Sequence, residues 1–366
     1  MQCTNPLKAF QIGYHPSGKP MYKICSYKVH HVEKRGDNWI PCFTPDLSPY
    51  REKSVREFIE VPCGNCSACR LNYSRQWADR CLLEANYHSS AYFATITYSD
   101  NFVPRSEYVC DRTGEVLEAL TLRKRDFQLF MKRLRKKFSD QKIRFFACGE
   151  YGSETFRPHY HAIIFGLKLD DLQVYKRERG FTYYNSPSLQ DCWSKDVSSQ
   201  ELVNSTNFSN IRGDNTPLRL PIGHIVVSEV TWETCAYTAR YVMKKLKGPE
   251  ANFYAEHCIE PPFTLMSRKP GIARQYYDEH PALFENAYIN VSTPTGGRKI
   301  RPPKYFDKLY DLDFPEASAE LKEQRRRLAA EAKAAKLAST SLDYESYLQV
   351  EQEALEDRIK ALRRTL

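Results

Sequence analysis

Residues 156–166, FRPHYHAIIFG, decide which fold and which chemistry we expect of this chain. The apolar run at their end predicts a strand, in which alternate side chains point to the same face. His159 and His161 therefore emerge side by side, which aims two imidazoles at one point, while Tyr160 and Ile164 lie on the other face. The plainer alternative is a pair of hydrogen-bonded histidines on a polar sheet face.

An acidic residue, Glu150, ends the apolar run IRFFACGE that precedes this strand. If the two runs form a hairpin, its carboxylate comes close to both histidines. Glu150, His159 and His161 would then form a three-ligand divalent-metal site with open coordination positions. Imidazole ligands alone suit zinc or manganese.

A helix with two tyrosines is predicted over residues 231–246, TWETCAYTARYVMKKL, with Thr231 as its N-cap. Tyr237, Tyr241 and Lys245 form one stripe of this helix, roughly 145° away from its apolar stripe. Tyrosines at this spacing often pack only on a neighbouring element. Beside a metal site and a lysine one turn on, we favour a catalytic role.

The order of these motifs resembles a known family. An apolar strand FATITY at residues 93–98, then His-x-His, then Tyr-x-x-x-Tyr-x-x-x-Lys, resembles the HUH endonucleases that initiate rolling-circle replication. The stretches PCGNCSACR, SRQWADRC, FACGEYG, RPHYHAIIFG, ARYVMKK and LMSRKPGI are similar to replication initiation proteins of gokushovirus-like Microviridae phages. They run from about residue 62 to residue 272, over half the chain. A lone His-x-His is weak evidence, whereas the ordered set is specific.

The resemblance implies a nicking and joining enzyme that acts on single-stranded phage origin DNA together with the host replication machinery. Magnesium or manganese would sit on the histidine pair. A tyrosine hydroxyl, with a pKa near ~10, needs help to attack a phosphodiester, and a divalent ion that polarises the phosphate would give it. Tyr237 or Tyr241 would become linked to the 5′ phosphate, and which attacks first stays open. Lys245 would neutralise the phosphate or assist proton transfer.

Twelve cysteines are present, and Cys63, Cys66 and Cys69 are clustered in PCGNCSACR. Two successive Cys-x-x-Cys spacings bring three thiolates within reach of one ion, with a fourth ligand to be found. Cys25, Cys42 and Cys81 are candidates, and the resemblance favours Cys3, in CTNP. A structural zinc there would tie the N-terminal segment to the domain. Three unligated cysteines in a turn are the alternative.

The formal net charge of +9 suits an acidic polymer as partner. Residues 121–145 hold ten Lys or Arg against two acidic residues, and residues 122–138 read as an amphipathic helix. Its basic face is either solvated or in contact with phosphates. The candidate DNA contacts are Lys132, Arg135, Lys136, Arg157, Arg240 and Lys244. Because no run of some 18 apolar residues and no signal peptide is seen, we expect no membrane and a place in the cytoplasm of a bacterial host cell.

Strands near residues 92–98, 143–149, 159–166 and 224–230, with helices between them, predict an α+β fold on a central antiparallel sheet. The resemblance implies the RRM/ferredoxin-like type of sheet, with helices against one face and the site on the other. A helix is expected at residues 68–87, a loop or hairpin at 101–119 and irregular structure at 167–222. The expected parts are a strand and turn segment (1–62), an endonuclease core (63–280), an extended linker (281–315) and a charged tail of two helices (316–366).

Two other classes of function fit these residues. A non-catalytic protein that binds single-stranded nucleic acid would use the basic helix, with the histidines merely structural. A metal-dependent hydrolase would use water in place of tyrosine. A relaxase or transposase of the HUH type would share the site but not the phage-like motifs. A covalent protein–DNA adduct separates the tyrosine enzymes from the first two classes.

Overall fold

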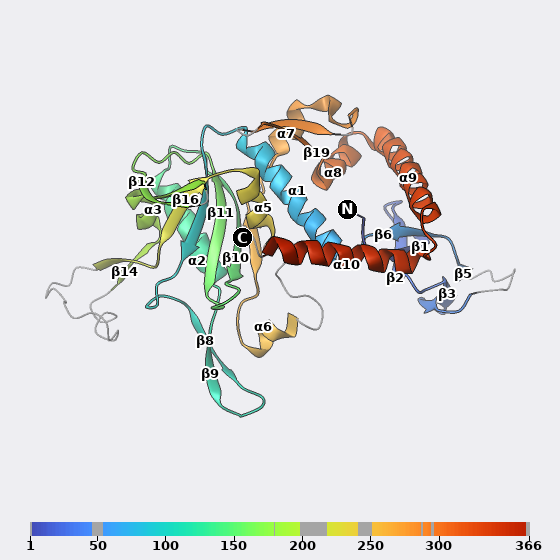
Figure 1. Ribbon diagram of the computed structural model, residues 1–366, viewed down its shortest axis with the longest axis horizontal. Coiled ribbons are helices and arrows are strands. Elements are labelled where there is room, and N and C mark those ends of the chain that lie inside the picture. The colour runs from blue at the N-terminus through green and yellow to red at the C-terminus, as the bar shows by residue number, and fades with distance from the viewer. Residues whose placement is uncertain are drawn as a thin grey trace. The chain divides into compact units, whose positions relative to one another are not determined.

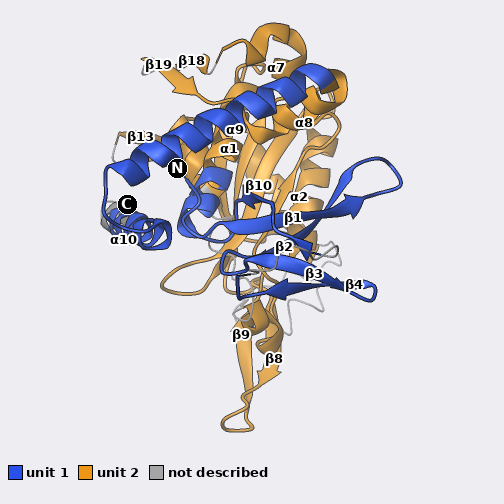
Figure 2. Cartoon of the chain, turned by 90° about the vertical axis from the view of Figure 1, so that its right-hand side faces the viewer, with its two compact units in different colours: residues 1–73, 316–366 blue, residues 74–315 orange. Residues whose placement is uncertain are grey.

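A computed structural model describes residues 2–45, 54–178, 180–197, 218–240, 251–286, 288–293 and 296–363. The chain divides into two compact units (Figure 2). Unit 1 consists of Met1–Tyr73 and Glu316–Leu366, and unit 2 of Ser74–Pro315. Within the described ranges, no helix combines the length and the apolar character that a membrane crossing requires.

A seven-stranded sheet forms the centre of unit 2, in the order β12-β13-β16-β7-β11-β10-β17, and every pair of neighbours is antiparallel (Figure 1). Its strands are β7 (Ala91–Thr97), β10 (Arg144–Tyr151), β11 (Pro158–Phe165), β12 (Gln173–Glu178), β13 (Phe181–Asn185), β16 (Ile225–Glu229) and β17 (Phe263–Met266). The four predicted strands are confirmed as four adjacent ones, β16-β7-β11-β10. The α+β prediction with an antiparallel sheet is confirmed.

One face of this sheet packs against helix α2 (Lys124–Lys137) and helix α3 (Pro187–Cys192). Tyr160 and Ile164 of β11 lie in one buried cluster with Phe127, Phe130 and Leu134 of α2. Repetition of apolar residues every three or four positions explains why α2 forms here, as predicted, and which side it buries.

The other face is covered as well. Phe146, Ile163 and Phe165 lie in a second cluster with Ala78 and Cys81 of helix α1 (Ser67–Ala85) and with Cys235 and Ala239 of helix α5 (Trp232–Arg240). The expectation of helices against one face only is therefore wrong. The reason is that the histidine strand carries large apolar side chains beyond its histidines, and burying them from water needs a cover.

Two hairpins of unit 2 flank the sheet. β8 (Arg105–Val109) and β9 (Val116–Leu120) form the hairpin expected at residues 101–119, and both views show it extending from the body of the unit (Figures 1 and 2). β14 (Ser194–Val197) pairs with β15 (Leu218–Pro221). The sequence predicts irregular structure over residues 167–222, yet the described part holds β12, β13, α3 and β14. Their strands are short and half-exposed, so they lack a clear apolar period.

Residues 281–315 do not form the expected extended linker. They contain a 3-10 turn η3 (Pro281–Phe284), the hairpin of β18 (Ile289–Thr293) and β19 (Gly296–Ile300), and helix α8 (Lys304–Asp313). Phe306 and Ile300 are fully buried in a third cluster with Leu83 of α1. Pro and Gly residues interrupt the segment and hide this apolar pattern. The remaining helices of unit 2 are α6 (Asn252–Glu256) and α7 (Arg274–Glu279).

Unit 1 joins the two ends of the chain. β1 (Leu7–Tyr14), β2 (Pro20–Ser26) and β6 (Phe58–Val61) form one sheet, and β3 (His31–Arg35), β4 (Asn38–Cys42) and β5 (Ser54–Val55) another. Helices α9 (Pro315–Ala338) and α10 (Tyr344–Arg363) complete the unit and confirm the two predicted tail helices. The Tyr344 hydroxyl donates to Glu60 over 3.1 Å, and its ring lies 5.8 Å from that of Tyr27. Sequence analysis treats these two segments as separate, whereas they form one unit.

Candidate active site

The hairpin of β10 and β11 places the three expected metal ligands together. Glu150 lies directly opposite His159, and Cys148 opposite His161. Since opposite residues of an antiparallel pair share a face, the carboxylate and both imidazoles point to the same side of the sheet.

The ligand atoms of this triad lie close enough to hold one ion. His159 Nε2 is 2.8 Å and His161 Nε2 3.3 Å from the same oxygen of Glu150, Oε1. The three ligand atoms all lie within 4.8 Å of one another. Glu150 and His161 are buried, and His159 is the more exposed member, so the site opens toward solvent on the His159 side.

The outer nitrogens of both imidazoles have partners that orient the rings. His159 Nδ1 lies 3.0 Å from the backbone carbonyl oxygen of Arg157, which can only accept, so Nδ1 donates. His161 Nδ1 lies 3.1 Å from the Thr95 hydroxyl on β7. Both Nε2 atoms thus face the carboxylate, the arrangement in which outer partners fix metal-binding histidines.

The electrostatics of the triad favour a bound cation. Burial raises the pKa of the Glu150 carboxyl, but hydrogen bonds and charges from His159 and His161 outweigh it and lower this pKa to about 2. A neutral His159 whose Nδ1–H is committed turns a lone pair toward a carboxylate oxygen 2.8 Å away. Either a proton or a metal ion must lie between these two acceptors, so the donor set fits a divalent cation.

Helix α5 brings Tyr237 to the triad. Thr231 is its N-cap, as predicted, because the Thr234 amide donates to the Thr231 hydroxyl (3.2 Å) and the Thr231 amide to the Thr234 hydroxyl (2.9 Å). The Tyr237 ring packs edge-on against His161, with centroids 5.2 Å apart, and against Phe93 at 6.0 Å. Tyr237 is 36% exposed, so its side chain reaches both the buried histidine and solvent.

The other predicted residues of this helix cannot be placed. Tyr241, Lys244 and Lys245 lie outside the described residues, as does the side chain of Arg240. His224, considered as an extra ligand, does not belong to the triad group.

The predicted DNA-contacting residues separate into two places. Lys132, Arg135 and Lys136 are exposed on α2, which covers the sheet face opposite the triad. Arg157 lies at the triad end of β11, and its guanidinium donates to Asp100 (2.6 Å) and to the carbonyl of Tyr98 (2.8 Å). Of the described cationic candidates, Arg157 alone is near the histidines.

The SRKPGI motif, residues 267–272, is held by its backbone. Arg144 of β10 donates to the carbonyls of Pro270 (2.9 Å) and Gly271 (3.1 Å), and Arg80 of α1 to that of Ile272 (2.9 Å). Glu84 of α1 pairs with Arg144 and accepts from the Ala273 amide. Sequence reasoning missed this network, as it missed Thr95, because the pairing partners are far apart in the sequence.

A second group of metal-capable side chains lies in unit 1. Cys3, Cys63, Cys66 and Cys69 have their sulfur atoms within 4.8 Å of one another. The structure thus places Cys3 as the fourth member, whereas Cys25, Cys42 and Cys81 are not part of this group.

Comparisons with known proteins follow this geometry. Residues 91–246 match the family model of the replication-associated proteins of the ORF2 type. The chain is a relative of the phage replication-associated proteins. Replication-associated protein ORF2 of Spiroplasma virus 4 is 29% identical over 314 residues, which cover 84% of this chain and 85% of that protein. Replication-associated protein VP4 of Bdellovibrio phage phiMH2K is 27% identical over 325 residues, 86% of this chain and 79% of that protein.

A third relative, Replication-associated protein ORF4 of Chlamydia phage 1, is 28% identical over 212 residues, 55% of this chain and 42% of that protein. No solved structure matches the chain. The segment shared with the replication-associated family model contains β7, the β10–β11 hairpin and Tyr237, which are the parts that build the triad and its neighbouring tyrosine.

Proposed function

We propose that this relative of the replication-associated proteins initiates rolling-circle replication by nicking and rejoining single-stranded DNA. The observation that carries the proposal is the contact of Tyr237 with His161, 5.2 Å between ring centroids, inside the segment that matches the replication-associated family. A tyrosine beside a metal-capable triad is the arrangement that HUH endonucleases need, and the sequence motifs resemble theirs.

Glu150, His159 and His161 would hold the divalent ion, magnesium or manganese, which when bound polarises the scissile phosphate and offsets charge on its oxygens. Thr95 and the carbonyl of Arg157 hold the two imidazoles in place. The more exposed side of the triad, at His159, is where a phosphate enters.

The Tyr237 hydroxyl attacks the phosphorus, its oxygen forms the new bond to the 5′ phosphate, and the 3′ oxygen leaves to become a hydroxyl. This hydroxyl primes the host polymerase in the bacterial cytoplasm. Because the phosphotyrosine bond replaces one phosphodiester bond with another, the step is reversible and the strand can be rejoined. Tyr241, four residues on, would serve as the second nucleophile that resolves the linkage, and Lys245 would neutralise the phosphate.

DNA at the nick would contact Arg157, with Arg240 and Lys244 as further candidates. The basic face of α2 (Lys132, Arg135 and Lys136) lies on the other side of the sheet, so we assign it to DNA farther from the nick.

The test uses full-length protein, Mn²⁺ or Mg²⁺, and single-stranded oligonucleotides tiled across the replicon that encodes it, followed by denaturing electrophoresis. One series is labelled at the 3′ end and the other at the 5′ end. Since the proposed linkage is to the 5′ phosphate, only the 3′ label should migrate with the protein. The 5′ label should appear in a shorter free strand.

Wild type is compared with Tyr237→Phe, Tyr241→Phe and the double variant. Tyr14→Phe, at a tyrosine 66% exposed in unit 1, is the matched control and should form the adduct normally. The adduct should vanish in the double variant and in Glu150→Ala. Binding without any adduct would indicate a non-catalytic single-stranded nucleic-acid-binding protein, and metal-dependent cleavage without an adduct would indicate a hydrolase that uses water.

A further inference from the structure

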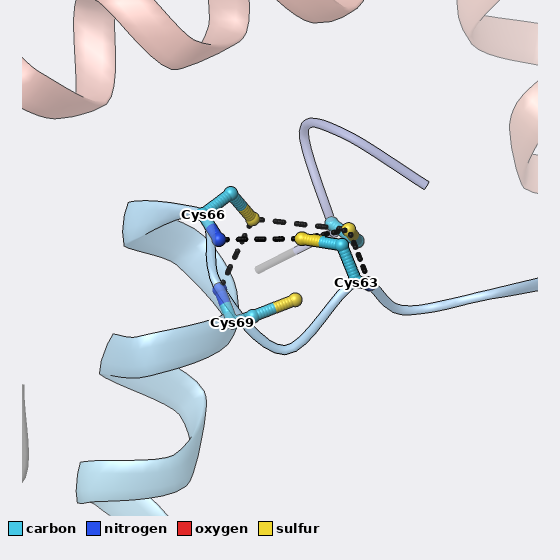
Figure 3. A group of neighbouring side chains, drawn as sticks. Cys63, Cys66 and Cys69 are labelled. Atoms are coloured by element: carbon cyan, nitrogen blue, oxygen red, sulfur yellow. Dashed lines mark hydrogen bonds between the residues drawn. The ribbon is translucent and has the colours of Figure 1, made fainter. Parts of the chain in front are cut away.

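Four cysteines of unit 1 converge from three places in the chain. Cys3 precedes β1, Cys63 follows β6, and Cys66 and Cys69 lie at the start of α1. Figure 3 shows Cys63, Cys66 and Cys69 with their side chains gathered at one point beside the first turn of this helix. The four residues are free thiols, and Cys69 is buried.

The spacing of the sulfur atoms fits a tetrahedral metal site. Cys3 Sγ lies 3.7 Å from Cys63 Sγ and 3.8 Å from Cys66 Sγ. Zinc–sulfur bonds of about 2.3 Å directed to the corners of a tetrahedron place sulfur atoms about 3.8 Å apart. A disulfide requires about 2.05 Å, so these separations fit thiolates around one ion and not bonded pairs.

Backbone amides of the same segment point at the sulfurs. The Cys66 amide lies 3.2 Å and the Asn65 amide 3.4 Å from Cys63 Sγ. The Cys69 amide lies 3.5 Å from Cys66 Sγ, and the Cys63 amide 3.4 Å from Cys3 Sγ. Gly64, at φ +74°, makes the tight turn that aims the first two amides. Such donors stabilise the negative charge that four thiolates carry, as does the N-terminus of α1.

We propose that Cys3, Cys63, Cys66 and Cys69 bind one structural Zn²⁺ that clamps unit 1 together. Four protein thiolates leave no open position, which is the mark of a structural site and not a catalytic one. β1 and β6 pair from Leu7 opposite Val61, so Cys3 and Cys63 stand at the end of that pair, and the ion closes it.

Unit 1 has little else to hold it. In the part of the unit that the structure describes, its buried apolar cluster consists of Phe10, Val29 and Val32 with a few half-buried neighbours. A core of that size contributes little stability, and small folds of this kind depend on a metal or another cross-link. Zinc binding would supply folding free energy directly.

The proposed site also determines where the C-terminal helix packs. Gln352 of α10 hydrogen-bonds to Thr4 and, over 3.3 Å, to the hydroxyl of Ser67, and each of these two residues is adjacent in sequence to a proposed ligand. Loss of the ion would therefore loosen α10 as well as the N-terminal strands.

The test is the zinc content of the full-length protein, purified under reducing conditions, by inductively coupled plasma mass spectrometry. Wild type should hold one zinc per chain, and Cys3→Ser and Cys66→Ser should each lose it. The matched controls Cys110→Ser and Cys258→Ser, at cysteines outside the group, should retain it. Glu150→Ala with His161→Ala should retain it too, which separates this site from the triad.

If the cysteine variants do not fold, wild type alone decides. Native mass spectrometry before and after a zinc chelator should show the loss of one zinc, and limited proteolysis should then cut faster between α9 and α10. Substitution with Co²⁺ should give the visible absorption of a tetrahedral thiolate site. The proposal is overturned if folded, reduced wild type carries no zinc, if both cysteine variants keep it, or if intact mass shows the four cysteines as disulfides.

Discussion

The contact between Thr95 and His161 shows how a residue outside the triad controls it. Thr95 of β7 lies opposite His161 of β11, and its hydroxyl is 3.1 Å from Nδ1. Thr95→Val keeps the shape of the side chain but removes this partner, so the ring loses its fixed orientation. We expect affinity for Mn²⁺ to fall about 10- to 100-fold, measured by isothermal titration calorimetry, with little change in stability.

Thr182→Val, on β13 away from the triad, is the control and should bind Mn²⁺ as wild type does. Equal affinities in the two variants would show that the Thr95 hydroxyl does not orient His161. Alternation along one strand was enough to predict the histidine pair, and adding Glu150 required only a hairpin between neighbouring runs. Thr95 required knowledge of which strand pairs with β11, which local patterns do not contain.

At the scale of elements, the buried pair Glu84–Arg144 joins helix α1, strand β10 and the SRKPGI segment. Burial raises the pKa of Glu84, but His88, the Ala273 amide and Arg144 outweigh it and hold the pKa below its usual value. Glu84→Gln leaves Arg144 buried without its countercharge, so urea unfolding should show a loss of about 3–5 kcal/mol at pH 7.

The pH dependence of this loss has a definite sign. Because the pKa of Glu84 is lower in the folded than in the unfolded protein, its stabilisation is complete above the unfolded value of about 4.3. It disappears as pH falls through the folded value. The difference in unfolding free energy between wild type and Glu84→Gln should therefore be constant from pH 7 to about 5 and shrink below about 4. Glu118→Gln, in an exposed pair with Arg105, should cost less than about 1 kcal/mol throughout. A Glu84→Gln loss as small as that of Glu118→Gln would show that the pair does not anchor the segment.

Helix α2 illustrates a correct element with a changed role. Its apolar period predicted the helix and its buried side, but only the sheet topology shows that its basic face lies opposite the triad. Lys132→Glu with Lys136→Glu should weaken binding of long single strands and flatten its salt dependence, measured by fluorescence anisotropy. Adduct formation on short oligonucleotides that span only the nick should be unchanged.

Lys360→Glu in the charge-balanced helix α10 is the matched control for that double reversal. If the α2 variant also loses adduct formation on the shortest active oligonucleotide, α2 contacts DNA at the nick and its assignment to distant DNA is wrong.

At the scale of the whole molecule, sequence patterns gave the helices and strands of both ends but not their association. Tyr27 meets Tyr344, and Glu60 meets Lys333, across nearly the whole length of the chain. Period and composition describe neighbours in sequence, so segments 1–62 and 316–366 read as separate parts. The same limit explains why residues 281–315 read as a linker, since their apolar residues are buried only by packing against α1 and α7.

The most direct measurement is the identity of the residue that carries the DNA. Adduct formed by wild-type protein is digested with nuclease and trypsin, and the nucleotide-bearing peptide is sequenced by mass spectrometry. Trypsin separates the two candidates, because Tyr237 falls in the peptide of residues 220–240 and Tyr241 in that of residues 241–244. We expect the nucleotide on Tyr237, Tyr241 or both, with none elsewhere. A nucleotide on a residue outside these two peptides would contradict the placement of the nicking centre at the Glu150, His159 and His161 triad.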